Sequence, residues 1–249
     1  MQTERPKIDQ INPNQKKLDI GDAINEAFEI YKKTAITSGT ALMVLMSIIV
    51  FLGVVGISYF FRADELEEVM KNFNPDTLSA NGLIIYFAVV ILLTVFSSPF
   101  IAGLLKMAHD AANNLEVQFS SLYYYVNHNF FPDILLVTFF TTTVSIGLTY
   151  LSKLLIPGIG GEILAIITSY AVSILTFIAL PLVLFKELSF IEALQTSVKQ
   201  ISQNFFVVLL LIIVAGLFSI VGIFAFCIGV FFTLPLVYAM QYVIQKKLS

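Results

Sequence analysis

The side chains that could carry out chemistry are few in this sequence and are spread along the chain. His109 precedes Asp110, and His128 stands between two asparagines, but neither histidine has further ligands at the spacing of a zinc site. The single cysteine, Cys227, lies in an apolar run, which is typical of a small packing residue. We therefore predict no metal, no cofactor and no catalytic residue, and we expect that the protein is not an enzyme.

Hydroxyl groups are the main polar groups inside the long apolar stretches. Thr138, Thr142, Ser145 and Thr149 follow one another at spacings of four, three and four residues, so they share one face of a helix. Such a face can serve packing, because hydroxyls bond to neighbouring helices and to their own backbone. It can also line a polar path for a solute. We favour packing and keep the polar path as the alternative.

The composition is that of a chain that lies in lipid. Of the 249 residues, 57% are hydrophobic and 12% are charged, which is half the charged share of an ordinary soluble domain, and the mean hydropathy is +0.87. Stretches without Asp, Glu, Lys or Arg that are long enough to cross a bilayer cover 34–61, 77–105, 134–152, 163–185 and 200–245. The last is too long for one crossing, so we expect a helical hairpin that turns near 219–222. The sequence predicts an all-α membrane protein with six transmembrane helices.

No ionisable residue lies deep in any of these predicted spans. Proton-coupled or ion-coupled transport usually needs such a residue, and an intramembrane protease needs carboxylates, a Ser/His pair or metal ligands. The sequence therefore argues against both classes of protein.

The basic residues predict the orientation, because Lys and Arg gather in cytoplasmic connections. Three of them, Arg62, Lys71 and Lys153, fall on one side of the predicted spans. The other side carries Arg5, Lys7, Lys16, Lys17, Lys32, Lys33, Lys106, Lys186, Lys199, Lys246 and Lys247. We predict that both termini are cytoplasmic.

A short amphipathic helix is predicted before each odd-numbered span, beginning near Leu18, Val117 and Leu188. In the third, Ser189 and Glu192 have the spacing of a capping box. We expect these helices to lie in the inner membrane–water interface, in contact with membrane lipids. The residues expected to be interfacial are Phe28, Tyr31, Tyr123, Phe130, Phe190 and Val198.

A proline recurs in each even-numbered span, in the order apolar, small, any, Pro, large apolar. Pro99, Pro181 and Pro235 each remove a backbone hydrogen bond and are expected to kink their helices. The two patterns together predict three repeated units, of about 18–107, 117–186 and 188–245. Each unit consists of an amphipathic helix and a helical hairpin. Residues 1–17 are expected to form a flexible polar N-terminus, and 18–249 a single membrane domain.

Two segments carry a family resemblance: the opening LDIGDAINEAFEIYKK over 18–33, and FIEAL over 190–194 followed by NFF over 204–206. In these the chain resembles bacterial six-span integral membrane proteins related to the membrane domain of glycerophosphodiester phosphodiesterases. The resemblance implies the six-span fold and the bacterial inner (plasma) membrane. It implies no phosphodiesterase activity, because these residues include nothing like the soluble phosphodiesterase domain.

Two functions remain open. The first is a non-enzymatic membrane protein that organises or regulates through contact with lipids, a protein partner or a second copy of itself. The alternative is a transporter or flippase-like facilitator for a lipid or other amphiphile, which the prolines and the hydroxyl face would allow. Nucleic acid is not an expected partner, because the formal net charge is −3 and the basic residues form no patch.

Overall fold

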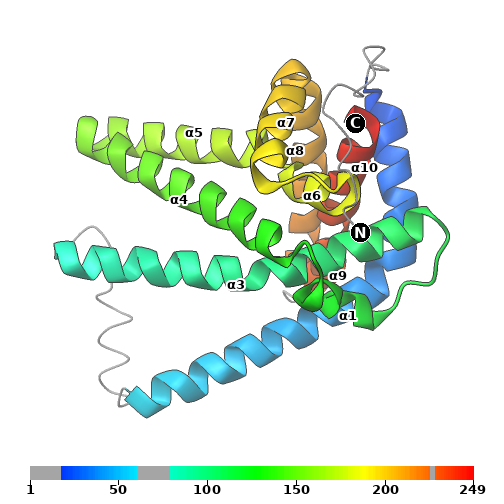
Figure 1. Ribbon diagram of the computed structural model, residues 1–249, viewed down its shortest axis with the longest axis horizontal. Coiled ribbons are helices and arrows are strands. Elements are labelled where there is room, and N and C mark those ends of the chain that lie inside the picture. Colours follow the sequence, from blue (N-terminus) through cyan, green and yellow to red (C-terminus); the bar gives the residue numbers. More distant parts are fainter. Residues whose placement is uncertain (1–17, 61–78, 225–227) are drawn as a thin grey trace.

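The computed structural model describes residues 18–60, 79–224 and 228–249, and within them the chain is helical without strands (Figure 1). Two short segments, η3 and η4, are 3₁₀-helices. The elements are α1 (Ile20–Phe60), α3 (Ala80–Ala112), η3 (Phe119–Asn127), α4 (Phe131–Leu155), α5 (Ile159–Leu175), α6 (Ala179–Lys186), α7 (Phe190–Gln203), α8 (Phe205–Val221), η4 (Gly222–Phe224), α9 (Gly229–Thr233) and α10 (Pro235–Leu248).

Five helical stretches of the described chain are long and apolar enough to cross a membrane. They are Ile20–Phe51, Ala80–Ala112, Phe131–Leu155, Ile159–Lys186 and Phe205–Phe224. These stretches correspond to the first five predicted spans, and by length and composition the chain fits a multi-pass membrane protein. The predicted sixth span is divided over the described residues into the five-residue α9 and the more polar α10.

The helices α3, α4 and α5 run beside one another along the long axis of the molecule (Figure 1). The turn between α4 and α5 is tight because Gly158 takes φ +82°, a left-handed conformation that costs glycine little. The chain reverses there, so α4 and α5 form an antiparallel hairpin. The start of α3 lies beside the end of α4, since Phe87 contacts Tyr150 at 5.9 Å between ring centroids.

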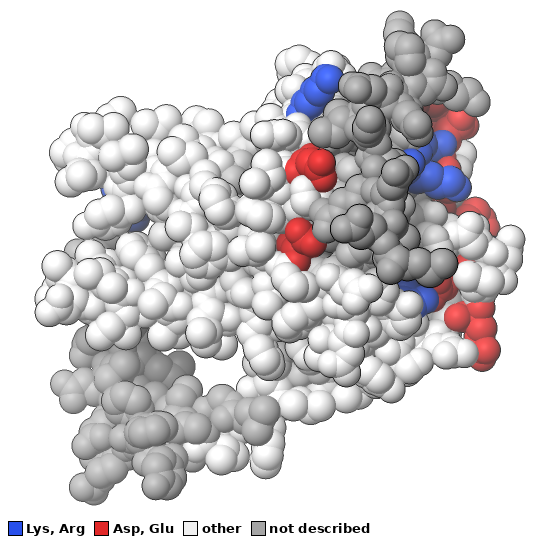
Figure 2. Space-filling view, viewed as in Figure 1, with Lys and Arg blue, Asp and Glu red and all other residues white. Residues whose placement is uncertain are grey.

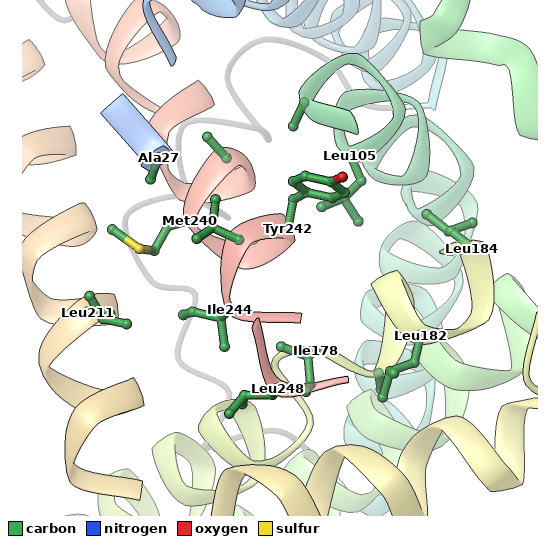
Figure 3. Close-up of a cluster of buried hydrophobic side chains, with 14 of the residues drawn as sticks. Ala27, Leu105, Ile178, Leu182, Leu184, Leu211, Met240, Tyr242, Ile244 and Leu248 are labelled. Atoms are coloured by element: carbon green, nitrogen blue, oxygen red, sulfur yellow. The ribbon is translucent and has the colours of Figure 1, made fainter. Parts of the chain in front are cut away.

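The hydrophobic core surrounds α10, at the other end of the molecule (Figure 3). Met240 and Ile244 are fully buried among side chains such as Ala27 of α1, Leu105 of α3 and Leu211 of α8. The sequence predicted the residues of α10 as the cytoplasmic half of the sixth span. α10 is instead the element that the other helices enclose.

The charged side chains gather at this same end of the molecule (Figure 2). Glu26 of α1 pairs with Lys246 at 2.8 Å and with Lys247 at 3.1 Å, which ties the beginning of α1 to the end of α10. The hydrogen bond to Glu26 raises the pKa of Lys246, against a smaller opposing effect of burial. Away from this end the exposed side chains are largely apolar, as on α4 and α5, and suit contact with lipid.

The three predicted amphipathic segments take three different forms. The first is the opening of α1 and continues into the span without a break. The third is α7, and its predicted capping box is confirmed, with the Ser189 amide donating to the Glu192 carboxylate at 3.0 Å.

The second segment was predicted as a short amphipathic helix with α-helical spacing, and it is a helix of the tighter 3₁₀ type, η3. Its backbone lies directly on α3, where a Cβ on Gly103 would overlap the Leu122 carbonyl. The narrower 3₁₀-helix suits this close approach better than a full α-helix does.

Candidate functional site: the cleft between α3, α4 and α5

A cleft of about 440 Å³ lies where the start of α3, the end of α4 and the middle of α5 meet. This volume is in the usual range for a small-molecule site. The cleft lies towards the Gly158 turn, away from the enclosed core around α10. Its lining residues are Leu83, Tyr86, Phe87, Val90, Ser145, Ile146, Thr149, Tyr150, Lys153 and Ser169.

The predicted hydroxyl face divides between the cleft and the helix backbone. Ser145 and Thr149 line the cleft. Thr138 instead donates to the Ile134 carbonyl of its own helix at 3.1 Å, and Thr142 is half-buried without lining the cleft. At the Thr138 end of the predicted face, the hydroxyl therefore bonds to the backbone of its own helix. At the end with Ser145 and Thr149, the face opens on the cleft.

Hydroxyl pairs join α4 to α5 beside the cleft. Ser145 and Ser169 are 3.1 Å apart between hydroxyl oxygens, and Ser152 and Thr168 are 3.4 Å apart. Ser152 also donates to the Leu148 carbonyl at 2.7 Å. The two hydroxyl pairs join the two helices, which is the packing role that the sequence favoured, while the cleft remains open next to them.

Aromatic side chains of α3 and α4 also line the cleft. The Phe87 ring meets Tyr150 edge to face and lies 5.5 Å from Tyr86. Two phenol groups and apolar ring faces thus share the cleft with Leu83 and Val90 of α3. Such a lining suits a molecule with a polar end and an apolar body.

Lys153 brings a positive charge to the cleft. It stands on α4 one turn beyond Thr149 and two turns beyond Ser145. Its ammonium pairs with Glu162 of α5 at 3.0 Å, with both side chains part-exposed. Among the described residues that line the cleft, Lys153 is the one with a charged side chain.

The three repeated prolines lie away from the cleft, and each is associated with a different local arrangement. Pro99 lies within the continuous α3, where the Ser98 hydroxyl donates to the Val95 carbonyl at 2.7 Å. That carbonyl is the one that a proline at position 99 leaves without its usual helical donor. The helix therefore satisfies its own free acceptor at this proline.

At Pro181 and Pro235 the helix is interrupted. The helix is interrupted between α5 and α6, just before Pro181. Because Pro181 has no N–H to donate to the Phe177 carbonyl, that carbonyl instead accepts a hydrogen bond from Gln241 of α10. Pro235 begins α10, and the backbone at Phe231 lies against Gly39 of α1. These two prolines mark the places where the chain docks other helices.

The predicted interfacial residues have different surroundings. Phe28 and Tyr31 lie in an aromatic cluster with Phe218 of α8, at 5.1 and 5.3 Å between ring centroids. Phe190 packs on Phe140 of α4, and Phe130 lies 4.8 Å from the ring of His128. Tyr123 and Val198 are exposed. Four of the six thus make contacts within the protein.

A charged cluster at the end of α3 was missed from the sequence. The Asp110 side chain is buried and accepts from Lys106 at 2.6 Å, and His109 lies 3.3 Å from its other oxygen. The Lys106 ammonium also sits 4.9 Å from the centre of the Tyr124 ring. Burial raises the pKa of the neighbouring Tyr125, helped by Tyr124 and Asp110. The spacing of Lys106 and Asp110, four residues on one helix face, was the signal that could have revealed it.

Within the described residues, no group of three or more His, Cys, Asp or Glu side chains is arranged to hold a metal ion. Comparisons of the chain with protein families, with curated proteins and with solved structures find no match. The functional conclusion therefore rests on the geometry of the chain itself.

Proposed function

We propose that this chain is a non-enzymatic integral membrane protein that organises or regulates through a bound membrane lipid or other amphiphile. The cleft between α3, α4 and α5 is the observation that carries this proposal. It combines an apolar wall, hydroxyl groups and one basic side chain in a hollow flanked by lipid-facing helices. An amphiphile has the same division between a polar end and an apolar body.

The test is retention of lipid by the purified protein. We would release it from lipid nanodiscs and count bound lipids by native mass spectrometry. A double variant, Ser145→Leu with Thr149→Leu, fills the cleft and should remove the bound lipid. Thr143→Leu, on an exposed face of the same helix, is the matched control and should retain it. Equal retention by both variants would argue against the cleft as the lipid site.

A facilitator that moves an amphiphile across the membrane is the second candidate. This function is favoured by the polar groups that follow one another along one face of α4, namely Ser145, Thr149 and Lys153, because successive polar groups can guide a headgroup. Proteoliposomes with a fluorescent phospholipid distinguish the two functions. A facilitator accelerates exchange between leaflets and loses this activity in the double variant. A protein that only binds leaves exchange at the protein-free rate.

We further propose that both termini lie on the cytoplasmic side of a bacterial inner membrane. The excess of basic residues on that side supports this orientation, and so do the ion pairs of Glu26 with Lys246 and Lys247, which hold the two ends of the described chain together. The membrane itself follows from the family resemblance. The resemblance and the recurring prolines support the three-unit repeat.

The number of crossings depends on the hairpin of α8 and α10. Six crossings follow from the apolar length of 200–245. Four crossings, with this hairpin entering and leaving at one face, are favoured by the contact of Phe218 with Phe28 and Tyr31. Phe218 lies about 20 Å along α8 from its start, at 1.5 Å per residue, yet it meets the charged end of α1.

Cysteine labelling decides between four and six crossings. In a Cys227→Ser background, we would place a cysteine at Phe224, which is 86% exposed, and label intact cells with an impermeant maleimide. Six crossings predict labelling from outside. Four crossings predict labelling only after permeabilisation. Cysteines at Ser79 and Ser202 are the controls for the outer and inner faces.

A partner protein or a second copy is the remaining route for an organising role. The exposed apolar faces of α4 and α5 offer a surface for either. The same mass spectra report both, since a dimer or a hetero-complex appears as an additional mass alongside any bound lipid.

A further inference from the structure

We propose that a groove between α1, α3 and α10 holds one acyl chain of a membrane phospholipid, whose ester carbonyl accepts a hydrogen bond from the Tyr238 phenol. This second lipid site goes beyond the proposed function, because it uses a different part of α3. The cleft is lined by residues of α3 up to Val90, and the groove by residues of α3 from Ser97 onward.

The groove fills part of the angle between two long helices. α1 and α3 contact each other and then run apart, away from the core around α10 (Figure 1). The groove has a volume of about 600 Å³. Leu42 and Leu104 in its lining are buried, whereas Met46, Ile49 and Ile228 are exposed. Since the exposed lining residues of α1 belong to a helical stretch that fits a membrane span, the groove is expected to open towards lipid tails.

Water is a poor occupant of this groove. Among its described lining residues, Ser97 and Tyr238 carry the polar side-chain groups. The Ser97 hydroxyl donates to the Leu93 carbonyl of its own helix at 2.8 Å, so it is already satisfied. An ordered water needs about two to four polar partners, whereas this lining leaves one side-chain group, the Tyr238 phenol. A hydrocarbon chain fits better, because it needs no polar partner along its length.

Tyr238 gives the groove a polar end. Its side chain is half-buried and, within the described part of the chain, its phenol makes no hydrogen bond. A hydroxyl that leaves water without a partner costs free energy, and an acceptor in the groove removes that cost. The carbonyl of a lipid ester is such an acceptor. The backbone carbonyls of a neighbouring transmembrane helix are less suited, because they are already bonded within their own helix.

The position of Tyr238 sets the direction of the bound chain. Tyr238 packs against the core cluster that contains Leu104 and Met107, in the part of α3 next to the charged end of the molecule (Figure 2). From there the groove follows α1 from Leu42 to Ile49, away from the charged end, over about 10 Å at 1.5 Å per residue. A phospholipid has its headgroup, ester and tail in the same order as the charged end, Tyr238 and the apolar groove.

The experiment is photolabelling of the full chain in dodecyl maltoside micelles that contain a phosphatidylglycerol with a diazirine in one acyl chain. The double variant Ser145→Leu with Thr149→Leu is the background, so that the cleft contributes no bound lipid. Labelled residues are located by peptide mass spectrometry. Labelling at Met46 and Ile49 should saturate as the mole fraction of the probe rises, and unlabelled phosphatidylglycerol should displace it. Labelling at Phe51, which is exposed outside the groove, should rise without saturation.

A variant that fills the groove tests where the lipid lies. Ile49→Trp places a large ring among the lining residues and should abolish the saturable labelling at Met46. The matched control is Ile48→Trp, at the neighbouring position, which is 51% exposed and lies outside the lining. This control should keep the saturable labelling.

The hydrogen bond to Tyr238 is tested with an ether-linked form of the same probe, which has no ester carbonyl. With Tyr238 intact, the ester probe should bind roughly fivefold more tightly than the ether probe, which is the scale of one neutral hydrogen bond. Tyr238→Phe keeps the ring and should bind both probes with the weaker affinity. A fivefold preference that survives in Tyr238→Phe would overturn the role of the phenol.

The remaining outcomes each contradict one part of the inference. Labelling at Met46 and Ile49 that never saturates would overturn the groove as a lipid site. Saturable labelling that survives Ile49→Trp would overturn its placement. A dimer in the native mass spectrum that shields Met46 and Ile49 from the probe would assign the groove to a second copy of the chain. Loss of lipid from the cleft leaves the groove intact, so failure of this inference is distinguishable from failure of the proposed function.

Discussion

The two ends of this molecule use polar groups in opposite ways. Near α10, polar side chains bond the free carbonyls at the break between α5 and α6: Gln241 donates to the Phe177 carbonyl, and the buried Ser197 donates to the Leu175 carbonyl at 2.8 Å. In the cleft, Thr149 and Lys153 face a hollow, and only some of the neighbouring hydroxyls pair across it. The comparison teaches that polarity alone does not mark a site. A polar group indicates a ligand where the surrounding helices leave space beside it.

The largest expected effect is on stability at the packed end. Met240→Ala should lower the free energy of unfolding by about 2–5 kcal/mol, because Met240 is fully buried and its loss leaves a cavity. Leu154→Ala, at a side chain 68% exposed on α4, should change it by less than about 0.5 kcal/mol. Unfolding by SDS in mixed micelles, followed by far-UV circular dichroism, measures both. Similar losses in the two variants would break the comparison between the ends.

Gln241→Leu should cost about 1–3 kcal/mol in the same unfolding measurement. It leaves the Phe177 carbonyl, already deprived of its helical donor by Pro181, without a partner. Gln195→Leu, at an exposed position of α7, is the matched control and should be close to neutral. A neutral Gln241→Leu would mean that the carbonyl is satisfied in another way.

Gln200→Leu should stabilise the protein, by roughly 1–2 kcal/mol. Both polar atoms of the Gln200 side chain are buried and have no hydrogen-bond partner within the described residues. Replacing such an amide with an apolar group of similar size removes its desolvation cost. A loss of stability in the unfolding measurement would show instead that this amide is paired in the membrane-embedded protein.

Ser145→Ala should have the smallest effect on stability, below about 1 kcal/mol, because it removes one hydroxyl-to-hydroxyl bond between α4 and α5. Lipid retention should also remain, since the cleft keeps its shape and Lys153. This variant tests the cleft end of the molecule, whereas the preceding variants test the packed end around α10. A large drop in stability would assign the cleft hydroxyls to packing alone.

The long helices could be predicted from the sequence because they depend on apolar length, which is a local property. The predicted stretch 77–105 overlaps α3 from Ala80 onward, with 77 and 78 outside the described residues, and 134–152 falls within α4. The hydroxyl face also led to the cleft, because Ser145 and Thr149 lie on one side of a helix whatever it packs against. The cleft lies against α3 because of where Phe87 sits, and no local sequence pattern predicts that position.

The arrangement around α10 could not be predicted in the same way. Gln241 and Gln245 suggest the watery end of a span when they are read along the chain, yet Gln245 is buried and Gln241 bonds a residue 64 positions away. The form of η3 likewise depends on Gly103 of another helix. Both features arise from contacts between segments distant in sequence. Hydropathy and periodicity do not report such contacts.

The position of α10 also sets the order in which this protein can mature at the ribosome. It is synthesised after α1, α3, α6 and α8, and it packs against side chains of all four, including Ala27, Leu105, Leu182 and Leu211. At about 5–20 residues per second, Leu105 waits roughly 7–27 s for Met240 to be made. During that interval the side chains that α10 later covers have no partner from that helix. The nascent chain is then most exposed to membrane proteases and most dependent on the insertion machinery.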